Sequence, residues 1–305
     1  MNDLNLSVIV LSFNTKEITD ECLKRLQSSV VSCQKKLRNK IEVIVVENAS
    51  SDGSLEMVQQ RHPWVKLIVS HENTGFSKGN NIGMKASQYP YILLLNSDSY
   101  VEEGTLETSL RYFESHPNCD ALGCRQILPN GNIQVSAGFL PTPLNTILWI
   151  SGLNIIPGVE KLVKPIHPRD KSFLNHEHQA EWVMGAFFMM TREVYEKTGG
   201  FDESIFMYGE EVELSKRIND LGFQIFYVPS ITITHLDKAS SQHLWEKPLL
   251  NEIKGLVRFF KQHYPQSYFL IKIVLALSLA LRLVIFTLLR NTQRQKAYWQ
   301  ALTVI

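Results

Sequence analysis

The sequence predicts an α/β fold in which helices flank a mostly parallel sheet. Through the first half of the 305 residues, short apolar stretches alternate with longer stretches of helical periodicity, which is the rhythm of βα units. The apolar stretches contain few polar residues, as expected of strands buried on both faces. Polar residues and glycines follow one apolar stretch after another, and loops at that edge of a parallel sheet commonly bind ligands.

The elements of the first half follow from this alternation, in order along the chain. We expect strands at residues 6–11, 41–46, 65–69, 91–95 and 121–124, because each is a short apolar run bounded by polar or turn-forming residues. We expect helices from 16 to about 33, from 54 onward, at 77–87 and at 102–115. In the first helix, Ile18, Cys22, Leu26 and Val30 recur at helical spacing.

The second half is less regular. Asn130-Gly131 lies between apolar residues and predicts a hairpin turn. Residues 141–179 contain prolines at 141, 143, 157, 165 and 168 and little periodicity, and such a segment often forms a substrate wall or lid. Regular structure is expected again as a strand at 182–190, a short helix from Arg192, a helix at 210–221, a strand at 224–228 and a helix at 246–263.

Composition narrows the class of protein. The chain has 31 Lys and Arg against 30 Asp and Glu, so we expect no nucleic-acid partner. Its four cysteines lack metal-ligand spacing, and we expect free buried thiols at Cys22, Cys33, Cys119 and Cys124. No basic region precedes the first expected strand, so we expect no signal peptide and a cytoplasmic protein.

A C-terminal segment, residues 273–289, is apolar apart from Arg282 and is flanked by Lys272, Arg290, Arg294 and Lys296. A helix of this length measures roughly 26 Å, slightly less than the core of a bilayer. We expect it to lie in the membrane interface with its cations toward anionic headgroups. A spanning helix with Arg282 snorkelling, or a buried packing helix, are the alternatives.

Asn96 and Asp98 follow the apolar run 91–95. They are two residues apart, so an extended backbone points both side chains to one side. Amide and carboxylate oxygens suit Mg²⁺ or Mn²⁺ carrying a diphosphate, although a surface turn with an Asx-type hydrogen bond would use the same residues. His235 follows the end of the last strand and could complete a metal site with Asp98, but a lone histidine is more often structural.

Three other loops at the same expected edge are polar, at residues 12–14, 47–53 and 73–83. The third is rich in glycine and opens a helix, so its backbone N–H groups could face an anion. It matches neither the dinucleotide-binding GxGxxG motif after the first strand nor the phosphate-binding GxxxxGK[ST] motif. These patterns disfavour dinucleotide oxidoreductases and P-loop enzymes.

Acidic residues gather further along the chain, beside aromatic ones. They are Asp202, Glu203, Glu210, Glu211 and Glu213. A carboxylate in a desolvated pocket can have a raised pKa and act as a general base. Acids in the first turn of a helix also favour the helix dipole, and for Glu213 we prefer that explanation.

Six ordered segments, at residues 7–14, 45–54, 73–81, 94–98, 199–203 and 208–211, resemble glycosyltransferase family 2. Within that family they are most similar to the rhamnosyltransferase-like enzymes of bacterial cell-surface polysaccharide and O-antigen assembly. The resemblance implies a GT-A fold with a nucleotide-binding mixed sheet, a nucleotide-sugar donor, a divalent cation and inversion at the anomeric carbon. We expect a catalytic domain at 1–240, with a donor half at about 1–125 and an acceptor half at about 126–240, and a helical membrane-associating region at 241–305.

The resemblance also implies roles for single residues. Donor binding would fall to Phe13, Glu47, Asp52, Gly75, Phe76, Gly79, Asn80 and Asn96. Asp98 would hold the metal together with Asn96 and His235. Glu211 would be the catalytic base, with Glu210 as the alternative. Trp182 and Gly185 would lie on the acceptor side. The chain departs from the family by having Glu at 47, 211 and 213 and Ser at 97, where the family often has Asp and Pro.

These departures matter because the placement of a base is critical at the ångström scale. Asn96 is a neutral ligand, so we expect weak cation binding without the donor diphosphate. The chain lacks a Gln-x-x-Arg-Trp motif, which disfavours a processive synthase. The predicted function is metal-dependent, inverting transfer of a hexose, first choice rhamnose from dTDP-rhamnose, to a lipid-linked saccharide on the cytoplasmic side of the membrane.

The sequence is compatible with other donors and with other functions. The donor could be a UDP-sugar, and the protein could bind nucleotide sugars without turnover. A sugar-1-phosphate nucleotidylyltransferase would need a glycine-rich basic loop after the first strand, where this chain has Ser12-Phe13-Asn14-Thr15. A homodimer is compatible with the sequence.

Overall fold

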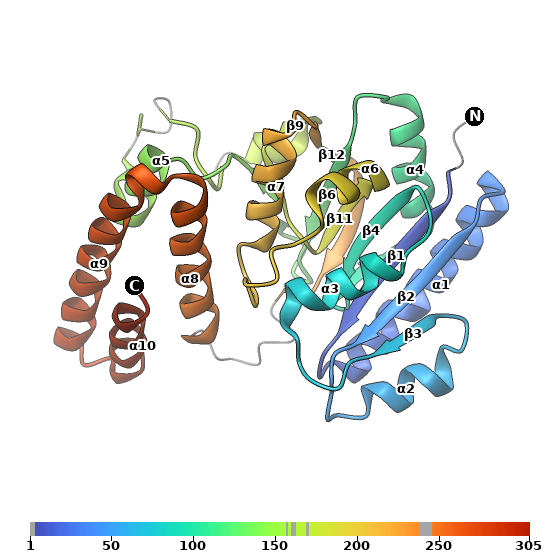
Figure 1. Cartoon of the computed structure of the whole chain (residues 1–305), viewed down its shortest axis with the longest axis horizontal. Coiled ribbons are helices and arrows are strands. Elements are labelled where there is room, and N and C mark those ends of the chain that lie inside the picture. Colours follow the sequence, from blue (N-terminus) through green and yellow to red (C-terminus); the bar gives the residue numbers. More distant parts are fainter. Residues whose placement is uncertain (1–3, 157, 160–162, 169–170, 238–245) are drawn as a thin grey trace.

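The computed structural model describes residues 4–156, 158–159, 163–168, 171–237 and 246–305 (Figure 1). Its first half contains β1 (Leu6–Ser12), α1 (Lys16–Leu37), β2 (Ile41–Glu47), α2 (Ser54–Arg61), β3 (Lys66–Val69), α3 (Gly75–Ala86), β4 (Tyr91–Asn96), β5 (Ser99–Val101), α4 (Thr105–Ser115) and β6 (Ala121–Ile127). The predicted alternation of strands and helices is therefore confirmed. The short strand β5 was not predicted, because three residues leave almost no periodic signal.

The second half contains β7 (Ile133–Gln134), β8 (Ala137–Gly138), α5 (Pro143–Ser151), β9 (His178–Ala180), β10 (Trp182–Val183), β11 (Phe187–Thr191), α6 (Arg192–Thr198), α7 (Glu210–Asp220) and β12 (Ile225–His235). It ends with α8 (Glu246–His263), α9 (Pro265–Leu288) and α10 (Thr292–Thr303). The hairpin predicted at Asn130-Gly131 is present, since β6 and β7 pair antiparallel.

The main sheet has the order β3-β2-β1-β4-β11-β6-β12-β5. In addition, β7 pairs with β6 and β9 pairs with β12. Strands β1 to β4 are parallel, and β11 runs antiparallel between β4 and β6, so the sheet is mixed. Alternate residues of each strand face opposite sides. Along β1, Val8 and Val10 pack with the core of α1, α2 and α4, whereas Ile9 packs with that of α3, α6 and α7.

Helix α3 lies unusually close to the sheet. A Cβ on Gly83 would come 2.4 Å from Cγ2 of Ile9, and one on Gly79 would come 2.5 Å from Cδ1 of Leu11. Both glycines therefore allow the helix to pack against β1. This packing places the N-terminus of α3 beside the ends of the parallel strands.

Two strands differ from the predicted bounds. The strand expected at 182–190 is divided into β10 and β11, and β10 pairs with β8 in a separate two-stranded sheet. Strand β12 continues past Val228 to His235, with a shift in register between Val228 and Thr232. Pro229 lies in this shift and has no N–H to give to a ladder.

The proline-rich segment 141–179 contains a helix that the sequence did not reveal. Helix α5 begins at a capping box, in which Thr142 and Asn145 bond each other's backbone N–H groups. It packs against α9 rather than on the sheet. A separate small core is formed by α5, α8, α9 and α10; its buried residues are Ile150, Ile253, Phe259, Phe260, Ile271, Leu275, Leu279 and Ala301.

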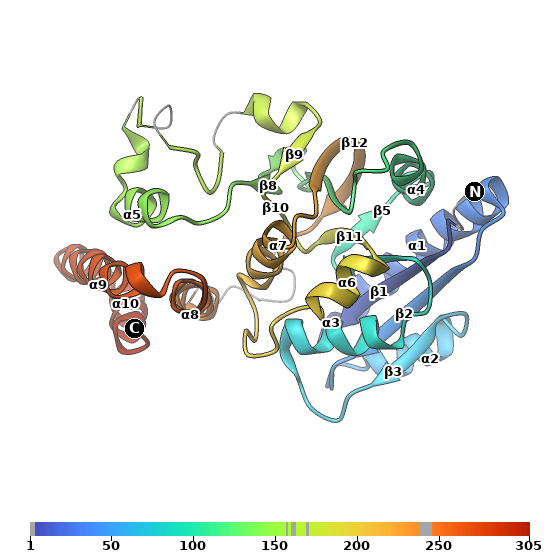
Figure 2. The same cartoon turned by 45° about the horizontal axis from the view of Figure 1, so that its top comes forward.

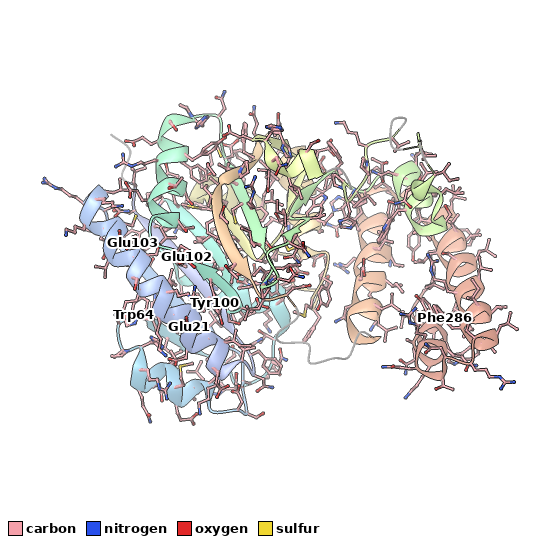
Figure 3. The ribbon with its side chains drawn as sticks, turned by 180° about the vertical axis from the view of Figure 1, so that it is seen from behind. Glu21, Trp64, Tyr100, Glu102, Glu103 and Phe286 are labelled. Atoms are coloured by element: carbon pink, nitrogen blue, oxygen red, sulfur yellow. The ribbon has the colours of Figure 1, made fainter. Side chains whose placement is uncertain are left out.

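Helix α9 is long and apolar enough to cross a membrane, and only 17% of its apolar window is buried. This exposure argues against the buried packing helix. Its apolar face includes Phe269, Leu277, Leu281 and Leu288, each more than half exposed. Figure 3 shows Phe286 of this helix at the end of the molecule remote from Glu21 of α1.

Arg282 does not point out of the helical cluster as snorkelling would require. Its Nη2 donates a hydrogen bond of 3.1 Å to the backbone oxygen of Ile150, at the C-terminal end of α5. Ser278 donates to the same oxygen at 2.7 Å, and Arg282 also contacts Ser278. Arg282 therefore joins α9 to α5, where a cation also favours the helix dipole.

Candidate active site

The loops after β1 and β2 are joined by Asp52. Its Oδ2 accepts the N–H of Lys16 at 2.9 Å, and its Oδ1 accepts the N–H of Ser54 at 3.0 Å. Asp52 thus satisfies backbone donors at the starts of α1 and α2. Partial burial acts to raise the pKa of Asp52, but the hydrogen bonds from Ser54 and Lys16 outweigh it and lower that pKa.

Asn48 joins the loops after β2 and β3. Its Nδ2 donates to Oδ1 of Asn73 at 3.0 Å, and its Oδ1 accepts the N–H of Thr74 at 3.0 Å. The neighbouring Glu47 is buried and accepts the N–H of Ser50 at 2.7 Å. Sequence reasoning did not single out Asn48, because only its place between the two loops shows what its amide connects.

The N-terminus of α3 meets the segment that precedes α7. Gly75 has a φ of +81°, and a Cβ there would come 2.6 Å from the backbone oxygen of Phe206. The N–H of Phe76 donates to that oxygen at 2.7 Å. Glycine is thus required at position 75 for its backbone conformation and for this close approach. The glycine-rich loop (residues 73–83) and the acidic segment (residues 199–213) therefore lie side by side.

Gly185 connects the predicted donor and acceptor sides. A Cβ on Gly185 would lie 3.6 Å from Cζ of Phe76 and 3.8 Å from Cβ of Glu211. The next residue, Ala186, accepts the N–H of Asn96 at 3.1 Å through its backbone oxygen. The break between β10 and β11 therefore brings Gly185 beside the end of β4, within reach of both Phe76 and Glu211.

Asp98 and His235, two residues of the predicted metal site, lie next to each other. Nε2 of His235 lies 3.4 Å from Oδ1 of Asp98, and its Nδ1 is 2.7 Å from Oε1 of Gln134. With the amide oxygen of Gln134 as acceptor, Nδ1 is the donor and Nε2 faces the Asp98 carboxylate. A cation bound by Nε2 and Oδ1 would make this contact favourable. Gln134 was not predicted, because its strand is only two residues long.

The turn at Asn96 and Asp98 is also joined to the first loop. Oγ of Ser97 lies 3.3 Å from Oγ1 of Thr15, next to the start of α1. Among the described residues, no third His, Cys, Asp or Glu joins Asp98 and His235 in a metal-binding cluster. Asn96, half-buried at the end of β4, is the additional oxygen ligand that the sequence predicts.

Glu210 and Glu211 open α7 and lack the partners that buried carboxylates usually have. Oε2 of each is buried and without a hydrogen-bond partner among the residues described. Burial raises the pKa of Glu210 well above its usual range, and the charge of Glu211 raises it further. Burial also raises the pKa of Glu211, and the charge of Glu252 adds to this effect.

Glu211 is the more accessible of the pair, since Glu210 is only 5% exposed and Glu211 is half-buried. Burial raises the pKa of the nearby Tyr208, and the charges of Glu210, Asp237 and Asp98 contribute. Tyr208 is therefore influenced by charges from both the start of α7 and the turn at Asp98.

Glu213 differs from its two acidic neighbours. It is completely buried, and it pairs with Arg217 at 2.6 Å and with Nε2 of His263 at 3.2 Å. Burial acts to raise the pKa of Glu213, but hydrogen bonds from His263 and Arg217 lower it overall. The preferred explanation from the helix dipole was thus incomplete, because Glu213 also binds a residue of α8.

Three other predicted residues, Trp182, Asn80 and Gly79, have evident structural contacts. The Trp182 ring is almost fully buried, and its Nε1–H donates to the backbone oxygens of Phe139 and Ile166, each at 3.1 Å. Asn80 is buried and donates to the Phe76 backbone oxygen at 3.0 Å. Phe13 is half-buried after β1, and Gly79 faces the sheet. Their roles in ligand binding stay predictions.

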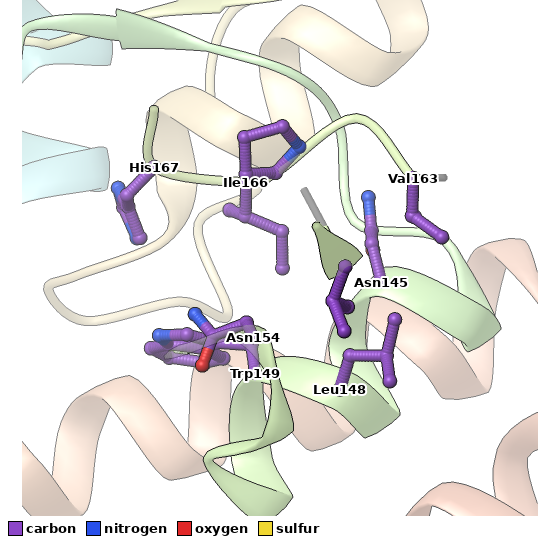
Figure 4. Close-up of a pocket in the computed structure, with 9 residues that line it drawn as sticks. Asn145, Leu148, Trp149, Asn154, Val163, Ile166 and His167 are labelled. Atoms are coloured by element: carbon purple, nitrogen blue, oxygen red, sulfur yellow. The ribbon is translucent and has the colours of Figure 1, made fainter. Parts of the chain in front are cut away.

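A cavity near Trp182 is too small for a sugar. It lies between α5 and the loop at 163–167 and has a volume of about 30 Å³, the order of one water molecule (Figure 4). Leu148, Trp149 and His167 are among its lining residues. The candidate site therefore remains the sheet edge described above.

Comparisons with known proteins identify the family of this chain. A model of glycosyl transferase family 2 matches residues 7–199. An N-acetylglucosaminyl-diphospho-decaprenol L-rhamnosyltransferase of Mycobacterium tuberculosis is 26% identical over 64% of this chain, and the chain spans 66% of that protein's length. Rhamnosyltransferase WbbL of Escherichia coli is 23% identical over 71% of this chain and 81% of its own length.

The fold resembles that of a mannosyltransferase from Pyrobaculum calidifontis, solved in complex with GDP-Man and Mn²⁺. The match covers 98% of this chain and 86% of the other, with a TM-score of 0.57 and 18% identity. This likeness confirms the mixed α/β, GT-A-like fold. Because the family model covers more than half of the sequence, the chain belongs to glycosyltransferase family 2.

Proposed function

We propose that this glycosyltransferase moves a hexose from a nucleotide sugar to a lipid-linked saccharide, with inversion and with a divalent cation. The carrying observation is the position of Gly185, which lies next to both Phe76 and Glu211 and one residue from the contact with Asn96. Phe76 from the predicted donor side and Glu211 as the predicted base thus lie beside the same glycine, and this supports the proposal. Such placement of two reactants can supply a large share of the barrier reduction.

Asp98, Asn96 and His235 would hold Mg²⁺ or Mn²⁺. The donor set is compatible with such a cation, because an amide oxygen, a carboxylate and an imidazole nitrogen that faces this carboxylate are all available. When bound, the cation neutralises charge on the departing diphosphate. Gln134 holds the His235 ring by its other nitrogen, as partners of metal-ligating histidines commonly do.

Glu211 would accept the proton of the attacking hydroxyl group. Its raised pKa makes it a stronger base than an ordinary carboxylate, and its buried, unpartnered oxygen is available to a hydroxyl donor. The hydroxyl oxygen would bond to the anomeric carbon as the nucleoside diphosphate leaves from the opposite face. Glu210 is the alternative base, but it is less accessible.

The first choice of donor is dTDP-rhamnose, and a UDP-hexose is the alternative. The names of the two relatives from Mycobacterium tuberculosis and Escherichia coli include rhamnosyltransferase, and the first also includes a diphospho-decaprenol. A lipid-linked acceptor also fits the exposed apolar face of α9, which would rest on the cytoplasmic surface of the membrane. A homodimer is compatible with this proposal.

A binding and turnover experiment tests the proposal. Thermal unfolding is measured with dTDP-rhamnose, UDP-glucose and GDP-mannose, each with and without Mn²⁺, because a ligand of the native state raises the unfolding temperature. We expect one donor to stabilise the protein only with Mn²⁺, and Glu211→Gln to retain that stabilisation while losing transfer. Stabilisation without transfer by the wild-type protein to any lipid-linked saccharide would favour a non-catalytic nucleotide-sugar-binding protein.

A further inference from the structure

Helix α8 lies between the acidic segment and the helices at the C-terminus (Figures 1 and 2). Gly255, Arg258, Gln262 and His263 contact the segment from 199 to 213. Gly255, Arg258 and Gln262 are spaced by three and four residues, so they lie on one face of the helix, and His263 lies at the edge of that face.

The contact at Gly255 is between backbones. A Cβ on Gly255 would come 2.5 Å from the backbone oxygen of Tyr208. Tyr208 has a φ of +75°, a conformation that costs a residue other than glycine on the order of 1–3 kcal/mol and persists where the surroundings impose it. Because Tyr208 precedes Glu210 by two residues, this contact lies directly before the two unpartnered carboxylates.

The contact at Arg258 is an ion pair. Its Nε donates to Oδ2 of Asp202 at 2.8 Å. The other oxygen of Asp202 accepts the N–H of Ser204 at 3.0 Å and its hydroxyl at 2.6 Å. Asp202 thus holds both α8 and the turn that leads to Phe206, whose backbone oxygen contacts the start of α3.

The contact at Glu213 is buried. His263 and Gln262 each lie 3.2 Å from Oε1 of Glu213, whose other oxygen pairs with Arg217. Arg217 also donates to the backbone oxygens of Thr198 and Gly200. Losing one partner of a buried charged group is costly, so this cluster fixes α8 against the first turn of α7.

The remaining surface of α8 packs with α9, through buried residues such as Ile253 and Phe260. One helix is therefore fixed both to the acidic segment and to the apolar C-terminal helices. We infer that α8 positions the carboxylates of Glu210 and Glu211, with Gly255, Arg258 and His263 as the positioning residues. The inference rests on the proposed function of Glu211, and it makes the geometry of the base depend on the seating of the C-terminal helices.

The test separates the position of the acidic segment from the identity of the donor. Arg258→Asp, Asp202→Arg and the double charge exchange are compared with the wild-type protein and with Lys254→Ala, a control at an exposed residue of the same helix. Amide hydrogen exchange is measured for residues 199–213, and release of nucleoside diphosphate is measured with dTDP-rhamnose and Mn²⁺. Gly255→Ala is a second variant that leaves every charge in place.

We expect faster exchange in 199–213 for each single variant and a return toward wild-type exchange for the double exchange. We also expect kcat to fall about 10-fold or more, with the donor KM nearly unchanged, because small misplacement of a base is expensive. Unchanged exchange in Arg258→Asp and in Gly255→Ala would overturn the inference. Absence of release by the wild-type protein, repeated with UDP-glucose and GDP-mannose in place of dTDP-rhamnose, would instead contradict the proposed function, and exchange would still decide the role of α8.

Discussion

Nε2 of His235 faces Oδ1 of Asp98 at 3.4 Å, and Gln134 occupies the other nitrogen of the ring. The end of β12, strand β7 and the turn after β4 thus each supply one side chain to a small polar cluster. The contact joins the end of the last strand of the sheet to the turn after β4, two segments that are 137 positions apart in the chain.

This relationship predicts the cation dependence of donor binding. We expect His235→Ala to lose most of the Mn²⁺-dependent rise in unfolding temperature that a donor produces. Gln134→Ala should weaken the Mn²⁺ affinity by about 10-fold, since partners behind a ligand typically contribute 10–100-fold. Titration of Mn²⁺ at a fixed donor concentration measures both. His71→Ala, at an exposed histidine, is the control; equal loss in that variant would contradict the assignment.

The raised pKa of Glu211 predicts the acidic side of the pH–rate profile. A base must be deprotonated, so kcat should fall as the pH drops through a pKa that burial has raised above the usual 4.5 of a glutamate. Glu211→Gln should lower kcat by about 10²–10⁴-fold. Profiles of both proteins with the same donor provide the measurement. A wild-type rate that stays constant down to pH 4 would remove Glu211 as the base.

Glu210 predicts an effect on stability. The pKa of Glu210 is higher in the folded state than in the unfolded state, so the folded state binds the proton more tightly. The free energy of unfolding therefore falls as the pH rises from the unfolded-state pKa through the folded-state pKa. Near pH 7, Glu210→Gln should therefore raise the unfolding temperature, by about 2–4 °C for each 1 kcal/mol gained. Thermal unfolding at pH 5 and pH 7.5 measures this. A variant that is less stable than the wild type at both values contradicts the expectation.

The close packing of α3 on β1 predicts a pair of coupled substitutions. Gly83→Ala should destabilise the protein by about 1–3 kcal/mol, because its new methyl group would overlap Cγ2 of Ile9. Ile9→Ala removes that group, so the double variant should lose less stability than the sum of the two single variants. Denaturant unfolding of the four proteins provides the test. Simple additivity would show that the helix moves away instead.

The apolar face of α9 predicts binding to vesicles. Leu277→Asp with Leu281→Asp should reduce co-sedimentation with anionic vesicles, because a helix in the interface must bury that face. Leu221→Asp is the matched control, since Leu221 is also about half exposed but lies at the end of α7. Equal binding by the double variant and the wild type would mean that α9 does not contact lipid.

Sequence periodicity predicted the strands and helices of the first half because each parallel strand is apolar on both faces and each helix has one buried face. The sequence offered a metal site at Asp98 and His235 only as an alternative to a structural histidine, and the two side chains do lie close together. It could not predict α5, whose apolar residues contact α9 more than 100 positions away rather than the nearby sheet. Asn48, Gln134 and Gly255 were missed for a related reason: each matters through a partner that only the folded chain brings close.

The hydrogen bond from Arg282 to Ile150 has a practical consequence for dividing this protein into parts. Truncation near residue 240 would remove α9 together with the rest of the C-terminal helices. It would expose the apolar side of α5 that packs against α9, and the backbone oxygen of Ile150 would lose its hydrogen bond from Arg282. Shortened versions of the chain would then tend to aggregate through α5. Amino-acid substitutions on the exposed face of α9 keep the contact between α5 and α9 intact. They are therefore the better way to change membrane binding.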